Sequence, residues 1–153
     1  MQLVANQLFV ELQAPADLNG GVDTDYFSMK NIIRASIFIH LGAIDSQANT
    51  LTVTLYEATA VAGTGEQALD IPRAYKYDAT NDIYEAVTVE ADGTIDCEAN
   101  AVYVIDIHES ELSVNDNYDC LKVTLDDPGV ADSYGCIYAI GNEIKNLATA
   151  LTD

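Results

Sequence analysis

Apolar and polar residues alternate with a period of two along much of the chain. The clearest case is TLTVTLYEA (50–58), in which Leu51, Val53 and Leu55 alternate with threonines and a tyrosine. Because successive side chains of a β-strand point to opposite faces of a sheet, this alternation predicts a strand with one buried face. The same pattern predicts strands within AVYVIDIHES (101–110), DCLKVTLDDP (119–128) and SYGCIYAIGN (133–142), and weaker ones at 8–12, 73–78 and 84–90.

The most apolar run, MKNIIRASIFIHLGAI (29–44), needs separate treatment because it also carries Arg34 and His40. It is shorter than the ~20 residues that a membrane-spanning helix needs, and Arg34 would lie near its middle. The four isoleucines within 32–41 disfavour a helix, since β-branched side chains lose rotamer freedom there. Gly42 ends the run. The sequence therefore predicts a strand over 32–41, buried on both faces along part of its length.

Short turn motifs separate the predicted strands, which number about eight. No helix is predicted beyond a turn within NEIKNLATAL (142–151). This pattern predicts an all-β fold, an antiparallel β-sandwich of jelly-roll-like type, although an immunoglobulin-like strand order stays open. Residues 1–153 are expected to form a single β-sandwich domain, from which 1–12 and 142–153 could extend as arms onto a neighbouring molecule.

The charge balance excludes several classes of partner. The 153 residues include 25 Asp and Glu but only six Lys and Arg, which gives a formal net charge of −19. Such a surface repels phosphate groups, so we expect no nucleic-acid partner and no docking on a membrane. Hydrophobic residues make up 49% of the chain, as in a folded domain. The N-terminal segment lacks the basic region of a signal peptide, so we expect a soluble, uncleaved protein made in the cytoplasm.

Histidine and cysteine offer little catalytic chemistry in this sequence. His108 lies among Asp106, Glu109 and Glu111, which suits either a general base or a solvated polar strand face. The second interpretation is favoured, because no metal-site spacing surrounds it, and nothing places Cys120 beside it as a thiol–histidine pair. Without a C-x-x-C motif, the cysteines are expected to be half-buried strand thiols with at most one bridge: Cys97, Cys120 and Cys136. We therefore expect no enzyme activity, no catalytic residue and no cofactor.

Two acidic loops contain oxygen ligands of the kind that calcium prefers. Asp23 and Asp25 form one, and NDNYD (115–119) forms the other, which resembles the start of an EF-hand loop. Cys120, however, stands where that loop needs a glycine. Turn capping explains these acids better than a weak surface site, and we predict no metal centre. The GTG motif at 63–65 lacks the Lys-Ser/Thr sequel of a phosphate-binding loop.

The segments of the chain follow one another in a recognisable order. A short N-terminal strand leads to LQAPAD, YFSMKNIIRASIFIHLGAI, LTVTLYEAT and ALDIPRAYKYDA, and VYVIDIHESEL, YDCLKVTLDDP and a last strand of small residues follow. This layout resembles that of small β-sandwich proteins encoded among the head genes of tailed bacteriophages, the capsid decoration or cement proteins. The resemblance covers most of the chain and lies in layout rather than in a chemical signature. It implies a non-enzymatic virion structural protein, commonly a homotrimer, that binds the major capsid protein on the outer surface of the phage head and stabilises the shell.

Under that resemblance, apolar residues beside turn-rich loops are the candidates for contact with capsid subunits. They form two groups, one in the N-terminal arm and one at 26–29. The residues are Leu3, Leu8, Phe9, Val10, Leu12, Tyr26, Phe27 and Met29. The alternative for each group is packing into the core of its own subunit, and that alternative is slightly favoured for the second group.

Two other classes of function stay open. Another phage component, such as a head-completion or tail structural protein, would share the fold and the composition. A carbohydrate-binding β-sandwich module would instead present Tyr75 and Tyr77 on an exposed face, because tyrosine rings can stack on sugars. The more usual place for such tyrosines is a core or a subunit interface.

Overall fold

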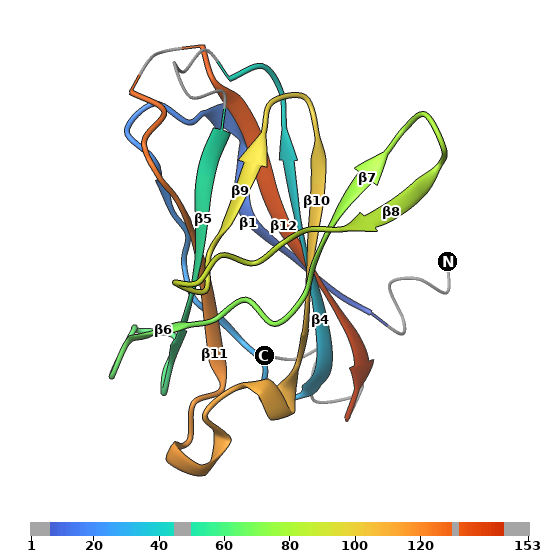
Figure 1. The fold of residues 1–153 in the computed structure, drawn as a ribbon. Helices are drawn as coiled ribbons and strands as arrows, with labels where there is room; N and C mark the ends of the chain where they lie inside the picture. Colours follow the sequence, from blue (N-terminus) through green and yellow to red (C-terminus); the bar gives the residue numbers. More distant parts are fainter. Residues whose placement is uncertain (1–6, 45–49, 130–131, 146–153) are drawn as a thin grey trace.

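The computed structural model describes residues 7–44, 50–129 and 132–145 (Figure 1). Within these ranges there are twelve strands and two single-turn 3-10 helices. The strands are β1 (Leu8–Asp17), β2 (Val22–Asp23), β3 (Phe27–Ser28), β4 (Ile32–Leu41), β5 (Thr50–Ala58), β6 (Gln67–Leu69), β7 (Ala74–Asp78), β8 (Ile83–Ala86), β9 (Ile95–Glu98), β10 (Val102–His108), β11 (Cys120–Leu125) and β12 (Tyr134–Ile144). The 3-10 helices are η1 (Glu109–Glu111) and η2 (Val114–Asp116).

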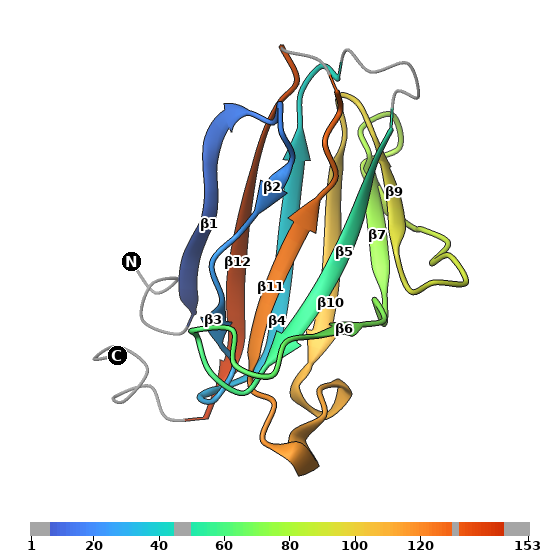
Figure 2. The same cartoon turned by 90° about the vertical axis from the view of Figure 1, so that its left-hand side faces the viewer.

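The strands form two antiparallel sheets that face each other (Figures 1 and 2). Sheet A has the order β1-β12-β4-β10-β7-β8, and sheet B has the order β2-β11-β5-β6, with β3 also on β11 and β9 also on β5. Four nested pairs produce this arrangement: β1 with β12, β2 and β3 with β11, β4 with β10, and β5 with β9. Nested antiparallel pairs that alternate between two sheets make a jelly roll. The predicted jelly-roll-like sandwich is therefore confirmed.

The core lies between the sheets, where the sequence alternation places it. Leu51, Val53 and Leu55 of β5 have no exposed surface, and neither do Ile105 and Ile107 of β10. Burying one such side chain contributes about 1.5–3 kcal/mol relative to leaving it in water. These residues thus hold sheet A against sheet B, while the residues between them face outward.

Strand β4 matches the predicted strand residue for residue and lies at the centre of sheet A, between β12 and β10. Ile37 and Ile39 point into the core and are fully buried. On the outer face, Phe38 is half-buried, while Arg34 and His40 are exposed. The partial burial of both faces explains why this run is the most apolar of the chain.

The alternation did not predict four short strands, because strands of two to four residues are too short to show a period of two. These are β2, β3, β6 and β9. The strand predicted at 84–90 also ends early, at Ala86 of β8. Beyond it, Val87 and Val89 pack against the core, and the Val87 N–H still donates to the Ala74 carbonyl oxygen of β7 at 2.9 Å. The connection from β8 to β9 crosses the open side of the sandwich in Figure 1. Its valines therefore close that side instead of extending a strand.

Parts of both predicted arms belong to sheet A. Residues 8–12 pair with β12 as part of β1, and Ile144 at the other end of the chain pairs with Ile32. The remaining parts, 1–6 and 146–153, lie outside the described residues. The β7–β8 hairpin extends the opposite edge of sheet A and leans away from the body of the sandwich (Figure 1).

Candidate functional site: the outer face of sheet A

The predicted contact residues of the N-terminal strand lie on two different faces. Leu8, Val10 and Leu12 are half-buried and pack against the core. Phe9 points the other way and is 62% exposed. Leu3 lies outside the described residues. Within β1, Phe9 is therefore the predicted contact residue whose side chain points to solvent.

The second predicted group is mostly part of the chain's own core. Phe27 is 6% exposed and Met29 is 2% exposed. Both therefore pack into the core of their own subunit, which is the alternative that the sequence slightly favoured for this group. Tyr26 is half-buried, and its hydroxyl donates a hydrogen bond of 2.7 Å to Glu66. Its contacts belong to a cluster on the outer face of sheet B.

Lys122 is the centre of that cluster, which we call the Lys122 cluster. Its Nζ lies 3.0 Å from Asp23 and 2.7 Å from Glu66, and it faces the rings of Tyr26 and Tyr56 at 5.2 and 5.1 Å. Burial lowers the pKa of Lys122, but hydrogen bonds to Glu66 and Asp23 outweigh this effect and raise it. Burial, followed by the hydrogen bond to Glu66, raises the pKa of Tyr26. The cluster therefore fixes its tyrosines inside the subunit.

The outer face of sheet A carries a different arrangement, which we call the aromatic row. The ring of Phe9 stacks on Tyr138 at 5.3 Å between centroids, and Tyr138 stacks on Phe38 at 5.0 Å. The strand register continues this line, because Phe38 pairs with Val104 and Val104 pairs with Tyr75. Burial raises the pKa of the Tyr138 hydroxyl. The row consists of Phe9, Tyr138, Phe38, Val104, Tyr75 and, on the hairpin, Tyr84.

Part of this row was visible in the sequence and part was not. Phe9 and Tyr75 are predicted candidates. Phe38 and Tyr138 are not, although their phase marks them: Phe38 lies between the buried Ile37 and Ile39 of a strand and so must face outward. What the sequence cannot supply is the register that places these residues side by side across strands far apart in the chain.

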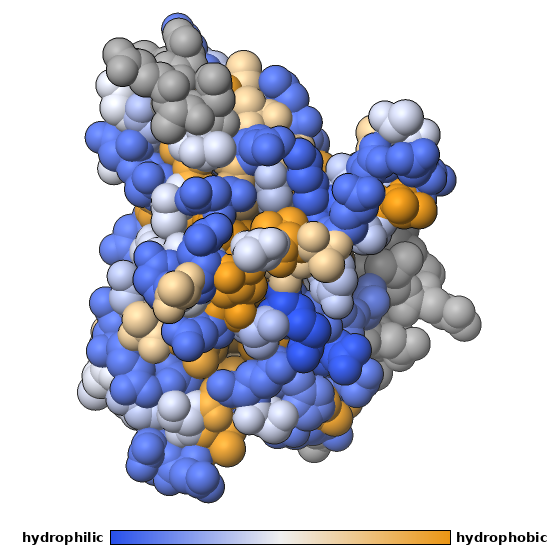
Figure 3. All heavy atoms as spheres, in the orientation of Figure 1, coloured by the Kyte–Doolittle hydropathy of each residue, from blue (hydrophilic) through white to orange (hydrophobic). Residues whose placement is uncertain are grey.

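A groove of about 330 Å³ opens where the hairpin leaves the sheet. It is lined by Ser36, Phe38, Tyr75, Tyr84, Val104 and Asp106. Hydrophilic side chains cover most of the side of the molecule seen in Figure 3, and hydrophobic ones gather across its middle and on the projecting hairpin. Tyr77, the other predicted tyrosine, donates a hydrogen bond of 2.7 Å to Asp82 and contacts the Tyr84 ring at 5.4 Å. Tyr75 and Tyr84 of the hairpin thus line the groove, while Tyr77 contacts Tyr84 from outside the lining.

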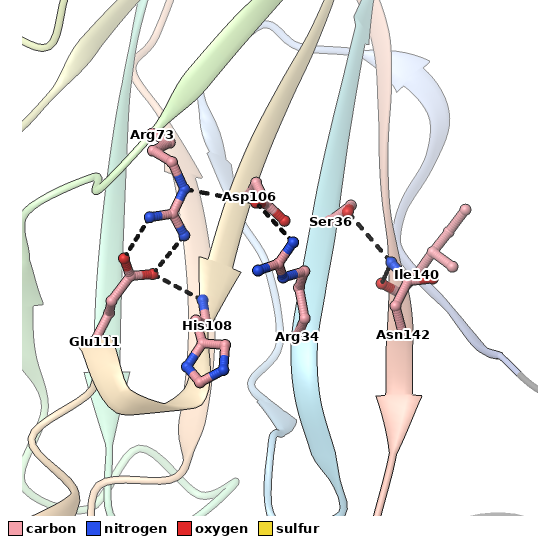
Figure 4. A network of polar contacts seen from close by, with 8 residues as sticks. All are labelled: Arg34, Ser36, Arg73, Asp106, His108, Glu111, Ile140 and Asn142. Atoms are coloured by element: carbon pink, nitrogen blue, oxygen red, sulfur yellow. Dashed lines mark hydrogen bonds and ion pairs between the residues drawn. The ribbon is translucent and has the colours of Figure 1, made fainter.

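A polar network borders the groove at Asp106 (Figure 4). Arg73 contacts Glu111 through two parallel hydrogen bonds of 2.8 and 3.0 Å, which raise the pKa of Arg73. The Arg73 and Arg34 side chains lie 3.6 and 3.9 Å from the Asp106 carboxylate. Opposite charges hold that carboxylate in place at the edge of an apolar surface.

His108 takes part in this network through its backbone rather than its ring. Its N–H donates to Glu111 at 2.7 Å, and its ring nitrogen Nδ1 accepts from the backbone N–H of Ser110 at 3.2 Å. These two bonds form a capping box at the start of η1. In this structure the histidine therefore has a structural role, and its ring contacts Ser110 rather than a thiol.

The three cysteines are unpaired in this structure. Burial raises the pKa of each thiol, that of Cys120 to about 12, and a hydrogen bond from the Cys120 sulfur to Asp119 adds to the effect. A thiol with a raised pKa is a poor nucleophile near neutral pH, since the thiolate is the reactive form. These cysteines have the environment of buried structural residues.

The acidic loops do not gather into a metal-binding arrangement within the described ranges. No group of three or more His, Cys, Asp or Glu residues is placed there to hold an ion. Asp23 instead pairs with Lys122, and Asp119 accepts from Cys120. Among the same residues, no helix is long and apolar enough to cross a membrane.

Comparison with known proteins adds little to this geometry. No protein-family model matches the chain, and neither does any curated protein. The crystal structure of the SPBc2 prophage-derived protein YomS aligns with a TM-score of 0.47 at 8% identity, over 89% of this chain and 92% of that chain. The Tobacco streak virus coat protein, solved as a dimer, aligns with a TM-score of 0.36 at 13% identity, over 90% and 86%. At scores this low, neither likeness carries an argument about this chain.

Proposed function

We propose that the chain is a non-enzymatic structural protein of a bacteriophage virion, and specifically a capsid decoration or cement protein. It would bind the major capsid protein on the outer surface of the head, as a homotrimer, and stabilise the shell. The observation that carries this proposal is the aromatic row, whose free end is the exposed Phe9 on the edge strand β1. Exposed apolar side chains in continuous groups are typical of protein–protein contact surfaces.

Four further features support the proposal. The jelly roll is a fold that viral capsid domains share, which is an argument by analogy. The layout of segments resembles that of decoration proteins over most of the chain. A net charge of −19 suits a place outside the shell, away from packaged DNA. The polar side chains beside the row make internal ion pairs and caps, as a structural protein would require.

The mechanism would be cross-bridging of capsid subunits. Phe9 would bury apolar area across a junction between two subunits, which removes that area from water and stabilises the junction. An interface of this kind needs about 1,200–2,000 Å² of buried surface, so one aromatic residue would anchor it without forming all of it.

The test is co-sedimentation of the purified chain with emptied heads of the virus whose genome encodes it. We expect saturable binding, and a native mass near three times 16.5 kDa by light scattering. Phe9→Asp should abolish head binding, because it places a charge in an apolar contact. Val61→Asp is the matched control, since Val61 is 61% exposed and lies in the loop after β5.

Each outcome separates the candidates. Binding that Phe9→Asp removes and Val61→Asp keeps supports the proposal. A wild-type chain that never sediments with heads overturns the decoration function. Recovery of the chain in purified tails or at the portal vertex would then favour a tail or head-completion protein.

A further inference from the structure

The groove at the hairpin end of the aromatic row has the lining and the size of a small-ligand site. Three rings, Phe38, Tyr75 and Tyr84, form its walls, and Val104 lies between them in the register. Its volume of about 330 Å³ is at the small end of the 300–1,000 Å³ range of ligand sites. Like such sites, it combines a mainly apolar lining with a few fixed polar groups.

Those polar groups lie at one border. The Asp106 carboxylate is held there by Arg34 and Arg73, and the Ser36 hydroxyl accepts a hydrogen bond of 3.3 Å from Asn142 (Figure 4). Across the part of the chain that the structure describes, no hydrogen bond engages the hydroxyls of Tyr75 and Tyr84. The groove therefore offers ring faces inside and hydrogen-bonding groups at its rim.

We propose that this groove binds a neutral saccharide through a pyranose ring of glucose-like configuration. One face of such a ring exposes only axial C–H hydrogens, which carry partial positive charge and stack on the electron-rich face of a tyrosine. Its equatorial hydroxyls point outward around the rim, where Asp106 can accept and the tyrosine hydroxyls can donate. The ligand thus matches both parts of the groove.

Other ligand classes fit less well. Asp106 is the one ionised side chain in the lining, and the chain carries a net charge of −19, so phosphate and carboxylate ligands are repelled. A lipid tail needs an enclosed apolar cavity, whereas this groove is open along the sheet. The ligand that fits the groove best is therefore a neutral molecule with one apolar face and a polar edge.

The site does not depend on the virion function. It lies on β4, β10 and the hairpin, while Phe9 lies on β1 at the other edge of the sheet. Sugar binding can therefore be tested on the isolated chain, independently of binding to phage heads. A decoration protein with this groove would also display a sugar-binding surface.

The experiment is saturation-transfer NMR on the isolated chain with chitotriose and with cellotriose. We expect transfer to the axial ring hydrogens of at least one sugar, and a Kd on the order of 1 mM, because one ring face makes most of the contact. Tyr84→Ala should weaken binding about tenfold. Tyr134→Ala is the control, since Tyr134 is 50% exposed, close to the 53% of Tyr84, but lies outside the groove.

Several results would overturn the site. No transfer to either sugar at about ten times the expected Kd would do so. Equal loss with Tyr84→Ala and Tyr134→Ala would show nonspecific contact. If Tyr84→Ala instead dissociates an oligomer of the wild-type chain, the groove is a contact between copies. Sugar binding by a chain that never binds heads would keep this site and remove the decoration function.

Discussion

The two outer faces of the sandwich both carry tyrosines, and they use them in different ways. On sheet B, the rings of Tyr26 and Tyr56 face the Lys122 ammonium at 5.2 and 5.1 Å, and Glu66 accepts hydrogen bonds from both Lys122 and Tyr26. On sheet A, no cation among the described residues faces the aromatic row in this way, and its hairpin end stays open as a groove.

The difference lies in what the chain itself brings to each face. Glu66, in the turn before β6, pairs with Lys122. The ion pairs and cation–π contacts of the Lys122 cluster are therefore internal to the subunit. The β7–β8 hairpin leans away from the body of the sandwich (Figure 1), and among the described residues Phe9 and Tyr84, at the two ends of the row, are 62% and 53% exposed. An aromatic residue on an outer face thus becomes structural where another segment covers it, and stays available for binding where none does.

The largest effect that would test this contrast is on sheet B. Lys122→Ala removes a cation whose side chain is 10% exposed, between two carboxylates and two rings. Losing one partner of a fully buried pair costs roughly 3–5 kcal/mol, but Asp23 and Glu66 are 72% and 42% exposed, so we expect about 2 kcal/mol. Urea denaturation followed by circular dichroism measures the change in the free energy of unfolding.

The control for that variant is Lys76→Ala. Lys76 forms an ion pair with Glu98, but both side chains are exposed, at 36% and 61%. Exposed pairs contribute about 0–1 kcal/mol. If the two lysine variants lose equal stability, the Lys122 cluster is an ordinary surface ion pair and the contrast between the faces is wrong.

A second prediction concerns the aromatic row. Tyr138→Ala removes two ring stacks, with Phe9 and with Phe38, each worth about 0.5–1.5 kcal/mol when well packed. Because the row is open to water on one side, we expect a total loss of about 1 kcal/mol, less than for Lys122→Ala. The same urea titration measures it. A loss above that of Lys122→Ala would mean that the row is the structural face.

Strict alternation explains how much of the fold was predictable. The strands with three or more alternating apolar residues, β5, β10 and β11, follow the pattern closely. Val87 and Val89 show the same alternation beyond the end of β8, yet they fill the open side of the sandwich, because burying an apolar side chain does not require that the strand continue. The nested strand order agrees with the jelly-roll expectation, although alternation by itself could not exclude an immunoglobulin-like order.

The candidate site was less predictable, for a physical reason. The phase of each strand places Phe38 and Tyr138 on an outer face, but their stacking depends on the register between β4 and β12, which are about a hundred residues apart in sequence. The role of Lys122 was also hidden, since an alternating lysine normally points to water. Phe27 and Met29 were ambiguous, because an apolar residue beside a loop can face either way.

The smallest expected effect is a dependence on pH that belongs to the Lys122 cluster. Hydrogen bonds from Lys122 and Tyr26 hold the pKa of Glu66 below its ordinary value of 4.5. A carboxyl group with a lowered pKa in the folded state stabilises the fold at pH values above its unfolded pKa. That contribution is lost as the pH falls below about 4.5 and through the lower folded pKa. Burial raises the pKa of Tyr138 above its ordinary value of 10.0, so the Tyr138 hydroxyl stays neutral throughout this range.

Glu66→Gln should therefore lose less stability than the wild type between about pH 7 and pH 3, although it begins from a lower value at pH 7. Other carboxyl groups with lowered pKa values, such as Asp78 and Asp127, give the same acid loss in both proteins. Glu85→Gln, an exposed change on the hairpin, should follow the wild type. Parallel stability curves for wild type and Glu66→Gln would show that Glu66 gains nothing from Lys122 in solution. The tyrosines of sheet B would then be held by ring contacts alone, and the two faces would differ only in how well they are covered.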